Sequence, residues 1–103
     1  MDNILKRAKE ADRILKRCNQ LIDEIEFLLE DIPFSVSVQV DNFDHDDIAL
    51  YWCTKEKYVM YEDSRVKIPF SCTKHYCKIV CFPYLEKLLD LAKEKLRTIR
   101  TRE

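Results

Sequence analysis

Residues 15–40 read LKRCNQLIDEIEFLLEDIPFSVSVQV, and the spacing of their apolar residues changes at the proline. Before Pro33 the apolar residues recur at alternating steps of four and three, as on one face of a helix. From Phe34 to Val40 nearly every second residue is apolar, as in a strand with one buried face. The residue before a proline avoids the helical conformation. This stretch therefore predicts a helix that ends near residue 31 and a strand over residues 34–40.

The helical spacing extends back almost to the first residue, so it predicts one long helix over residues 2–31. A third apolar column, Ile14, Leu21 and Leu28, makes its apolar face wide enough to pack on a sheet or a bundle. The rest of this face occupies the a and d positions of four heptads: Ile4, Ala8, Ala11, Leu15, Cys18, Ile22, Ile25, Leu29 and Ile32.

Further strands are expected over residues 48–54, 58–62 and 65–70, and residues 77–82 form either a fifth strand or a short helix. The short connection at residues 55–57 favours an antiparallel hairpin, and Pro69 favours an edge position. A last helix is expected to begin at Pro83, which suits a first helical position, and to end near Arg100. We therefore predict one α+β domain over residues 1–103. It has a four- or five-stranded, mainly antiparallel sheet and both helices on one of its faces.

The chain contains no glycine in 103 residues, which excludes several classes of enzyme. Glycine-rich loops that cradle phosphates or dinucleotides, and the nucleophile elbow, all require it. Nothing in the sequence brings a nucleophile and a base together. We expect no enzymatic activity and no cofactor. The net charge of −1 gives no overall attraction to nucleic acid or to a membrane, and no apolar run is long enough to span one.

Charge is segregated along the first helix, and this favours a homodimer. Residues 6–17 hold six basic residues against Glu10 and Asp12, whereas residues 23–31 hold five acidic residues and no basic one. An antiparallel second copy would place each basic half against an acidic half. The alternative is a solvated polar face on a helix that packs within its own chain. The predicted dimer interface consists of Leu15, Cys18, Ile22, Ile25 and Leu29.

The sheet face away from the helices is expected to be aromatic. If Trp52 faces the helices, Tyr51 faces away, and the register of the next strand decides what joins it. Such a face suits a protein interface or stacking of single-stranded bases, unless the rest of the chain covers it. The residues predicted for this second protein-binding surface are Tyr51, Tyr58 and Tyr61.

Nucleic-acid binding is the alternative function. Five basic residues near the end of the chain could contact phosphates, although basic residues also stabilise the last turns of a helix. Only Glu94 opposes them: Lys93, Lys95, Arg97, Arg100 and Arg102.

Two clusters could bind metal, and we expect neither to do so. Cys72, His75, Cys77 and Cys81 have zinc-type donors, but their spacing matches no zinc motif. The alternatives are free thiols or a disulfide among Cys53, Cys72, Cys77 and Cys81. The second cluster is an acidic loop, which suits Mg²⁺, Ca²⁺ or a nuclease but matches no known site. Its residues are Asp41, Asp44, His45, Asp46 and Asp47.

The sequence therefore predicts a small intracellular protein-interaction module that forms a homodimer and binds an unidentified protein partner. Scarce Asn and Gln with abundant charge resemble hyperthermophile proteins. Abundant Lys, Ile and Tyr also suit AT-rich coding, and an inhibitor or adaptor of a virus or mobile element, acting in an infected host cell, is the form we expect.

Overall fold

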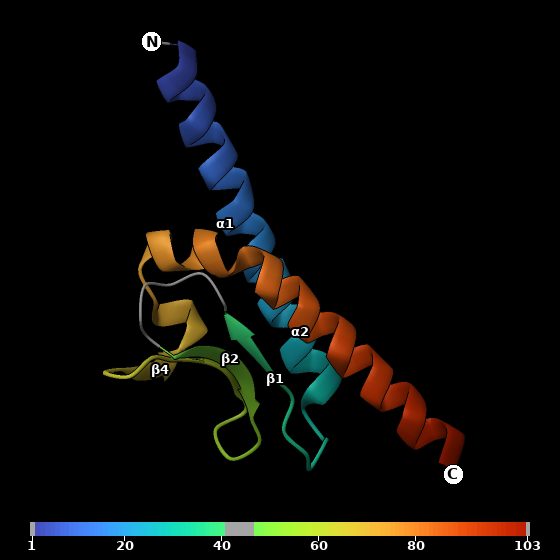
Figure 1. Cartoon of the computed structure of the whole chain (residues 1–103). Helices are drawn as coiled ribbons and strands as arrows, with labels where there is room; N and C mark the ends of the chain where they lie inside the picture. Colours follow the sequence, from blue (N-terminus) through green and yellow to red (C-terminus); the bar gives the residue numbers. More distant parts are fainter. Residues whose placement is uncertain (1, 41–46, 103) are drawn as a thin grey trace.

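The computed structural model describes residues 2–40 and 47–102, and it confirms the α+β fold (Figure 1). Two long helices pack against a four-stranded antiparallel sheet. The elements in chain order are α1 (Asp2–Leu29), β1 (Ser37–Val40), β2 (Ile48–Cys53), β3 (Tyr58–Glu62), β4 (Lys67–Pro69), the short 3₁₀ helix η1 (Phe70–Cys72) and α2 (His75–Arg102).

The strands lie in the order β1-β2-β3-β4, so each pairs with its neighbours in sequence. Leu50 of β2 lies between Val38 of β1 and Tyr61 of β3. The turn between β2 and β3 places Lys57 at φ 61°, in the left-handed region that glycine normally occupies. Its backbone N–H donates to the carbonyl of Cys53 at 2.8 Å. A chain without glycine has thus placed a lysine in this conformation.

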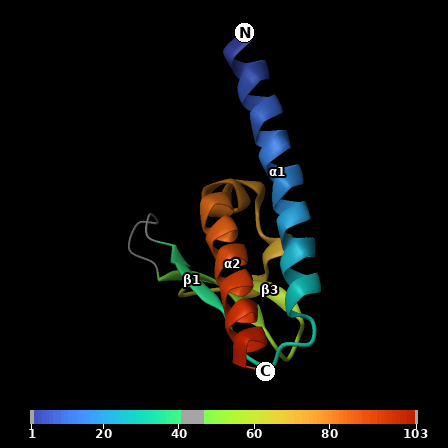
Figure 2. The ribbon, with the colours of Figure 1, turned by 90° about the vertical axis from the view of Figure 1, so that its right-hand side faces the viewer.

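The core lies between the sheet and the two helices. The alternation of β2 is clean: Ile48, Leu50 and Trp52 are buried, and the residues between them are half-buried. They meet Cys18, Leu21, Ile22, Ile25 and Leu29 of α1, and Cys81, Leu85, Leu88 and Leu89 of α2. Full burial of one such aliphatic side chain contributes about 1.5–3 kcal/mol. Seen from the side, both helices cover the same face of the sheet (Figure 2).

Of the two alternatives predicted for residues 77–82, a fifth strand or a short helix, the structure has the helix, because these residues belong to α2. This helix begins at His75 and contains Pro83 in its interior rather than at its first position. Cys81, Leu85 and Leu88 are buried at helical spacing, so packing on the core outweighs the strand propensity of this stretch. A proline inside a helix removes one hydrogen bond and bends the axis. Accordingly, α2 changes direction between its first turns and the rest (Figure 1).

Other elements are shorter than predicted. α1 ends at Leu29, β1 begins at Ser37, β2 ends at Cys53 and β4 spans only Lys67–Pro69. The start of β4 has a clear cause, because the Asp63 carboxylate accepts hydrogen bonds of 2.7 Å from the backbone N–H groups of Arg65 and Val66. This turn engages residues 63–66 before the strand can begin.

Candidate interaction surfaces

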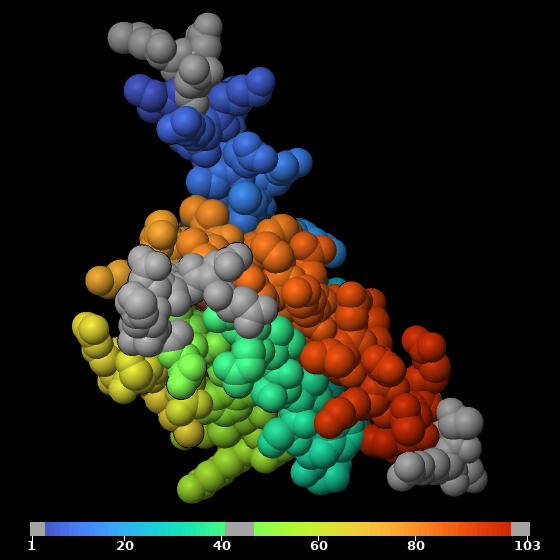
Figure 3. Space-filling view, viewed as in Figure 1, coloured from blue at the N-terminus to red at the C-terminus, as the bar shows by residue number. Residues whose placement is uncertain are grey.

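The first half of α1 projects beyond the rest of the molecule, and we call residues 4–17 the arm. Figures 1 and 3 show its outer turns standing clear of the sheet and of α2, whereas Ile14, near its base, packs against the core. Ile4 is 72% exposed and Leu5 62% exposed. Ala8 is also exposed, and Leu15 is half-buried where the arm meets the domain. The apolar stripe of α1 therefore continues for several turns past the point where its own core covers it.

The arm is strongly basic. Its six cations face only Glu10 and Asp12, a net charge of +4. Arg13 pairs with Glu10 at 3.5 Å and Lys16 with Asp12 at 3.8 Å, both at the exposed surface. Such pairs contribute about 0.3–0.5 kcal/mol each. Five of these cations occupy outer heptad positions, away from the apolar stripe: Lys6, Lys9, Arg13, Lys16 and Arg17. The sixth, Arg7, lies beside the stripe.

Most of the predicted dimer interface is used within the chain. Cys18, Ile22, Ile25 and Leu29 are at most 4% exposed and belong to the core. Only Leu15 retains an exposed part. A four-heptad seam between two copies of α1 is therefore wrong, because its second half already packs on α2 and the sheet. The acidic half of α1 cannot meet a basic half through this face.

The open face of the sheet has one tyrosine fewer than predicted. The register places Tyr58 opposite Cys53 and Met60 opposite Tyr51, so these four residues share the face away from the helices. Tyr58 is 49% exposed, whereas Met60 is only 4% exposed. Half-buried Tyr51 lies below Lys67, whose Nζ is 5.5 Å from the ring centre. The Tyr51 hydroxyl is buried with no hydrogen-bond partner among the described residues. This face is therefore uneven and partly covered, and it is no open aromatic platform.

Tyr61 lies on the opposite face, packed into the core at 5% exposure. The prediction that Tyr61 lies on the face away from the helices is wrong, because the register pairs it with Leu50 rather than with Tyr51. Its hydroxyl contacts the Asp63 carboxylate at 3.4 Å. Burial is the main reason that the pKa of Tyr61 is raised.

Two of the five C-terminal cations are engaged in contacts that hold α2 in place. Lys93 pairs with Glu24 of α1 at 3.7 Å. Lys95 donates to the backbone carbonyl of Ser35 at 3.3 Å. Arg97 is exposed, and the side chains of Arg100 and Arg102 lie outside the described residues. Phosphate binding by these five residues stays a prediction.

The five cysteines are free thiols. Cys18 and Cys81 are fully buried, and Cys18 Sγ lies 3.7 Å from the carbonyl oxygen of Lys78. Burial raises the pKa of the Cys81 thiol to about 12 and also raises the pKa of Cys18. Cys53 and Cys77 are half-buried, and Cys72 is exposed. Cys18 and Cys81 thus act as small apolar residues in the core.

No group of three metal-binding side chains comes together within residues 2–40 and 47–102. His75 is exposed at the start of α2, while Cys81 points into the core, so these donors face different surroundings. Four of the five residues of the acidic loop, Asp41 to Asp46, lie outside the described part of the chain. The fifth, Asp47, is exposed.

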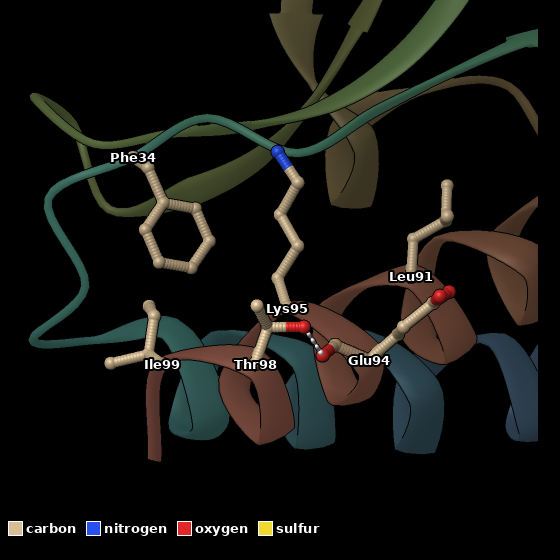
Figure 4. A pocket seen from close by; sticks show the side chains of 6 residues that line it. All are labelled: Phe34, Leu91, Glu94, Lys95, Thr98 and Ile99. Atoms are coloured by element: carbon tan, nitrogen blue, oxygen red, sulfur yellow. Dashed lines mark hydrogen bonds between the residues drawn. The ribbon is translucent and has the colours of Figure 1, made fainter. Parts of the chain in front are cut away.

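A groove that the sequence did not predict lies between the second half of α2 and the segment leading into β1 (Figure 4). Its volume is about 480 Å³. The lining is mostly apolar, with Phe34 on one side and Leu91 and Ile99 on the other. Lys95 crosses it, with Nζ 5.3 Å from the centre of the Phe34 ring. The sequence does contain a signal for this groove, since Phe34 is the first apolar residue after Pro33 and Ile99 is an apolar residue near the end of α2.

Comparison with known proteins gives no family for this chain. It matches no protein-family model, no curated protein and no solved structure. Among the described residues, no helix has the length and apolar character that a membrane span requires. The surfaces described above are therefore the basis for a functional proposal.

Proposed function

We propose that this protein is a small interaction module, an adaptor or inhibitor that acts by docking and performs no catalysis. The observation that carries this proposal is the arm, whose apolar residues at the outer end, Ile4, Leu5 and Ala8, are exposed. Ile4 and Leu5 together remain more than half exposed. An ordered helix with an uncovered apolar face is typical of a surface that another helix covers.

The homodimeric form of this proposal uses the arm alone. In an antiparallel pair of arms, Ile4 would lie opposite Leu15 of the second copy, and Ala8 opposite Ala11. Each layer repeats by two-fold symmetry, which gives an isologous interface. The two central alanine layers allow the helices to approach closely, and the larger residues close both ends. The cations at outer heptad positions point away from this seam.

Such a dimer is expected to be weak. Four layers form a contact much smaller than the roughly 1,200–2,000 Å² of a standard stable interface. The two arms also carry the same charge, +4 each. Added salt screens this repulsion, so self-association should strengthen as the salt concentration rises. This behaviour is opposite to that expected for an acidic partner.

The test is to place a charge on the stripe and compare its effect with the same charge elsewhere. Ala11→Glu puts a carboxylate at the centre of the seam, whereas Gln20→Glu adds one on the exposed outer face of α1. Light scattering after size-exclusion chromatography should show self-association weakened at least ~10-fold in the first variant only. Equal effects of both variants, or of neither, would contradict a dimer through the arm.

Nucleic-acid binding is the second candidate, favoured by six cations within residues 6–17 on a projecting helix. Fluorescence anisotropy with single- and double-stranded DNA and RNA, at ~50 and ~200 mM salt, tests it. Affinity should fall steeply between the two conditions, because bound phosphates release their counterions. Arg13→Glu with Arg17→Glu should abolish the binding. Absence of binding at the lower salt concentration would eliminate this candidate.

We also propose that the protein works inside the cell. Five cysteines is an odd number, and all five are free thiols, which is typical of a reducing compartment.

A further inference from the structure

We propose that the free edge of β1 and the adjoining groove form a second docking site, which binds an extended peptide of another protein. The peptide would add to the sheet as a strand, place an apolar side chain in the groove and direct a carboxylate to Lys95. This site shares no residue with the arm, so the proposal does not depend on the homodimer.

Among the described residues, no other strand pairs with the outer edge of β1. Trp52 donates its backbone N–H to the carbonyl of Val36 at 2.8 Å, which sets the alternation along β1. In an antiparallel pair, every second residue directs its N–H and C=O to the neighbouring strand. The even-numbered residues of β1 therefore bond to β2, and Ser37 and Gln39 direct a row of backbone groups away from the sheet. Both residues are exposed.

One side chain shows that this row faces the groove. The carbonyl of Ser35 belongs to the same outward series as Ser37, and Lys95 of α2 already donates to it at 3.3 Å. Figure 4 shows Lys95 extending from α2 toward the strand that follows Phe34. A peptide continuing this row would thus run between β1 and α2, past the lining residues Leu91 and Ile99.

The edge of β1 also lacks the features that normally block strand addition. Exposed edges are usually protected by charged residues, proline or a bulge. The opposite edge of the sheet, β4, contains both Lys67 and Pro69. In contrast, β1 has the sequence SVQV, with no charge and no proline. The two edges of the same sheet therefore differ, and only β1 is suited to accept another strand.

The charge beside the groove indicates what the peptide carries. Lys95 Nζ has three donors, and its hydrogen bond to Ser35 uses one of them. No carboxylate of the described residues forms a salt bridge with it, unlike Lys93. A carboxylate on the peptide would complete this site. Ser37–Val40 of a second copy include no acid, and a second copy would have to use Asp41, the next residue in the sequence. The mass measurement below distinguishes that occupant from a peptide of another protein.

The probe is a phage-displayed library of random peptides of about eight residues, the length of a well-formed strand, selected on the immobilised full chain. Enriched peptides should alternate apolar and polar residues and contain an Asp or Glu. The best peptide is then synthesised with a fluorophore, and its dissociation constant is measured by anisotropy. A copy methylated at alternate backbone nitrogens should lose binding, because strand addition depends on main-chain hydrogen bonds.

Two variants of the protein separate the edge from the charge. Ser37→Pro removes an outward N–H but no bond to β2, a position where proline is tolerated, and it should weaken binding at least ~10-fold, about 1.4 kcal/mol. Lys95→Met should weaken binding severalfold and remove the preference for the acid. Lys55→Met, in the exposed β2–β3 turn, is the control and should change nothing. Circular dichroism confirms folding, and Gln39→Pro replaces Ser37→Pro if the latter unfolds.

Three results would overturn the proposal. The library could yield no peptide that binds, or the selected peptides could bind Ser37→Pro and Lys95→Met as well as the unaltered chain. The third result is a doubled mass that Ser37→Pro reduces to that of one chain, which would identify a second copy as the occupant of the edge.

Discussion

Glu26 of α1 accepts a hydrogen bond of 3.3 Å from the backbone N–H of Val59 in β3, so one carboxylate joins the first helix to the sheet. The contact is partly buried. Removal from water raises the pKa of this carboxyl above its ordinary value of 4.5, and the hydrogen bond from Val59 opposes this increase only in part. Ionised Glu26 is therefore mildly unfavourable at this position.

The stability of the fold should consequently depend on pH through Glu26. With a pKa higher in the folded than in the unfolded chain, the folded state holds the proton more tightly. Glu26 thus stabilises the fold fully below about pH 4.5, and this contribution is lost as the pH rises through the folded pKa. Glu26→Gln keeps an acceptor for Val59 without the charge. Its Tm relative to the unaltered chain should be higher at pH 7 than at pH 4, and a constant difference would contradict this account.

The outer turns of the arm, before Ala11, should contribute little to the stability of the domain. Leu5 is 62% exposed, so Leu5→Ala is expected to change the free energy of unfolding by less than ~0.5 kcal/mol. Ile25, in the second half of the same helix, is fully buried, and Ile25→Ala should cost about 2–5 kcal/mol. Urea unfolding, at a protein concentration too low for self-association, measures the free energy of unfolding of both variants. A large loss in Leu5→Ala would show that the arm folds back on the domain.

Substitutions at Lys57 measure how much stability the β2–β3 turn loses because it lacks a glycine. The φ of 61° at Lys57 is unfavourable by about 1 kcal/mol for any residue with a Cβ atom. Its side chain also donates to the carbonyl of Glu30 at 2.7 Å, and both Lys57→Gly and Lys57→Ala remove this bond. The difference between the two variants isolates the backbone. Thermal unfolding should show the glycine variant to be the more stable by about 1 kcal/mol, and equal stabilities would be inconsistent with a strained turn.

The thiols should differ widely in reactivity. The thiolate is the reactive form, and burial keeps Cys18 and Cys81 protonated at neutral pH. Cys72 is exposed. Labelling with a maleimide at pH 8, followed by mass spectrometry of the peptides, should modify Cys72 first and reach Cys18 and Cys81 only after unfolding. Early modification of Cys81 would mean that α2 opens near its start.

The order and type of most elements could be predicted from the sequence because their periodicities are long and unambiguous. The steps of four and three in α1, from Cys18 on, and the alternation in β2 both match the buried faces of the structure. The start of α2 stayed open between strand and helix, since Cys77–Phe82 is rich in strand-forming residues and precedes a proline. Only its packing on the core, through Cys81, shows that it is helical.

The surfaces were harder to predict than the elements. A heptad pattern shows that a face is apolar but not what covers it, and in α1 the chain itself covers Ile22 and Ile25. The side of the sheet on which Tyr61 lies depends on a register that no local pattern determines. The groove beside Lys95 joins segments 60 residues apart, a relationship that exists only in the folded chain.

The most direct test of the interaction-module proposal is sedimentation equilibrium of the unaltered protein over a range of concentrations at ~50 and ~500 mM salt. We expect a reversible increase from 12.4 kDa toward twice this mass, more complete at the higher salt concentration because the basic arms repel each other less. A mass of 12.4 kDa under every condition, up to the solubility limit, would contradict the homodimer. Any partner of the arm would then have to be a different molecule.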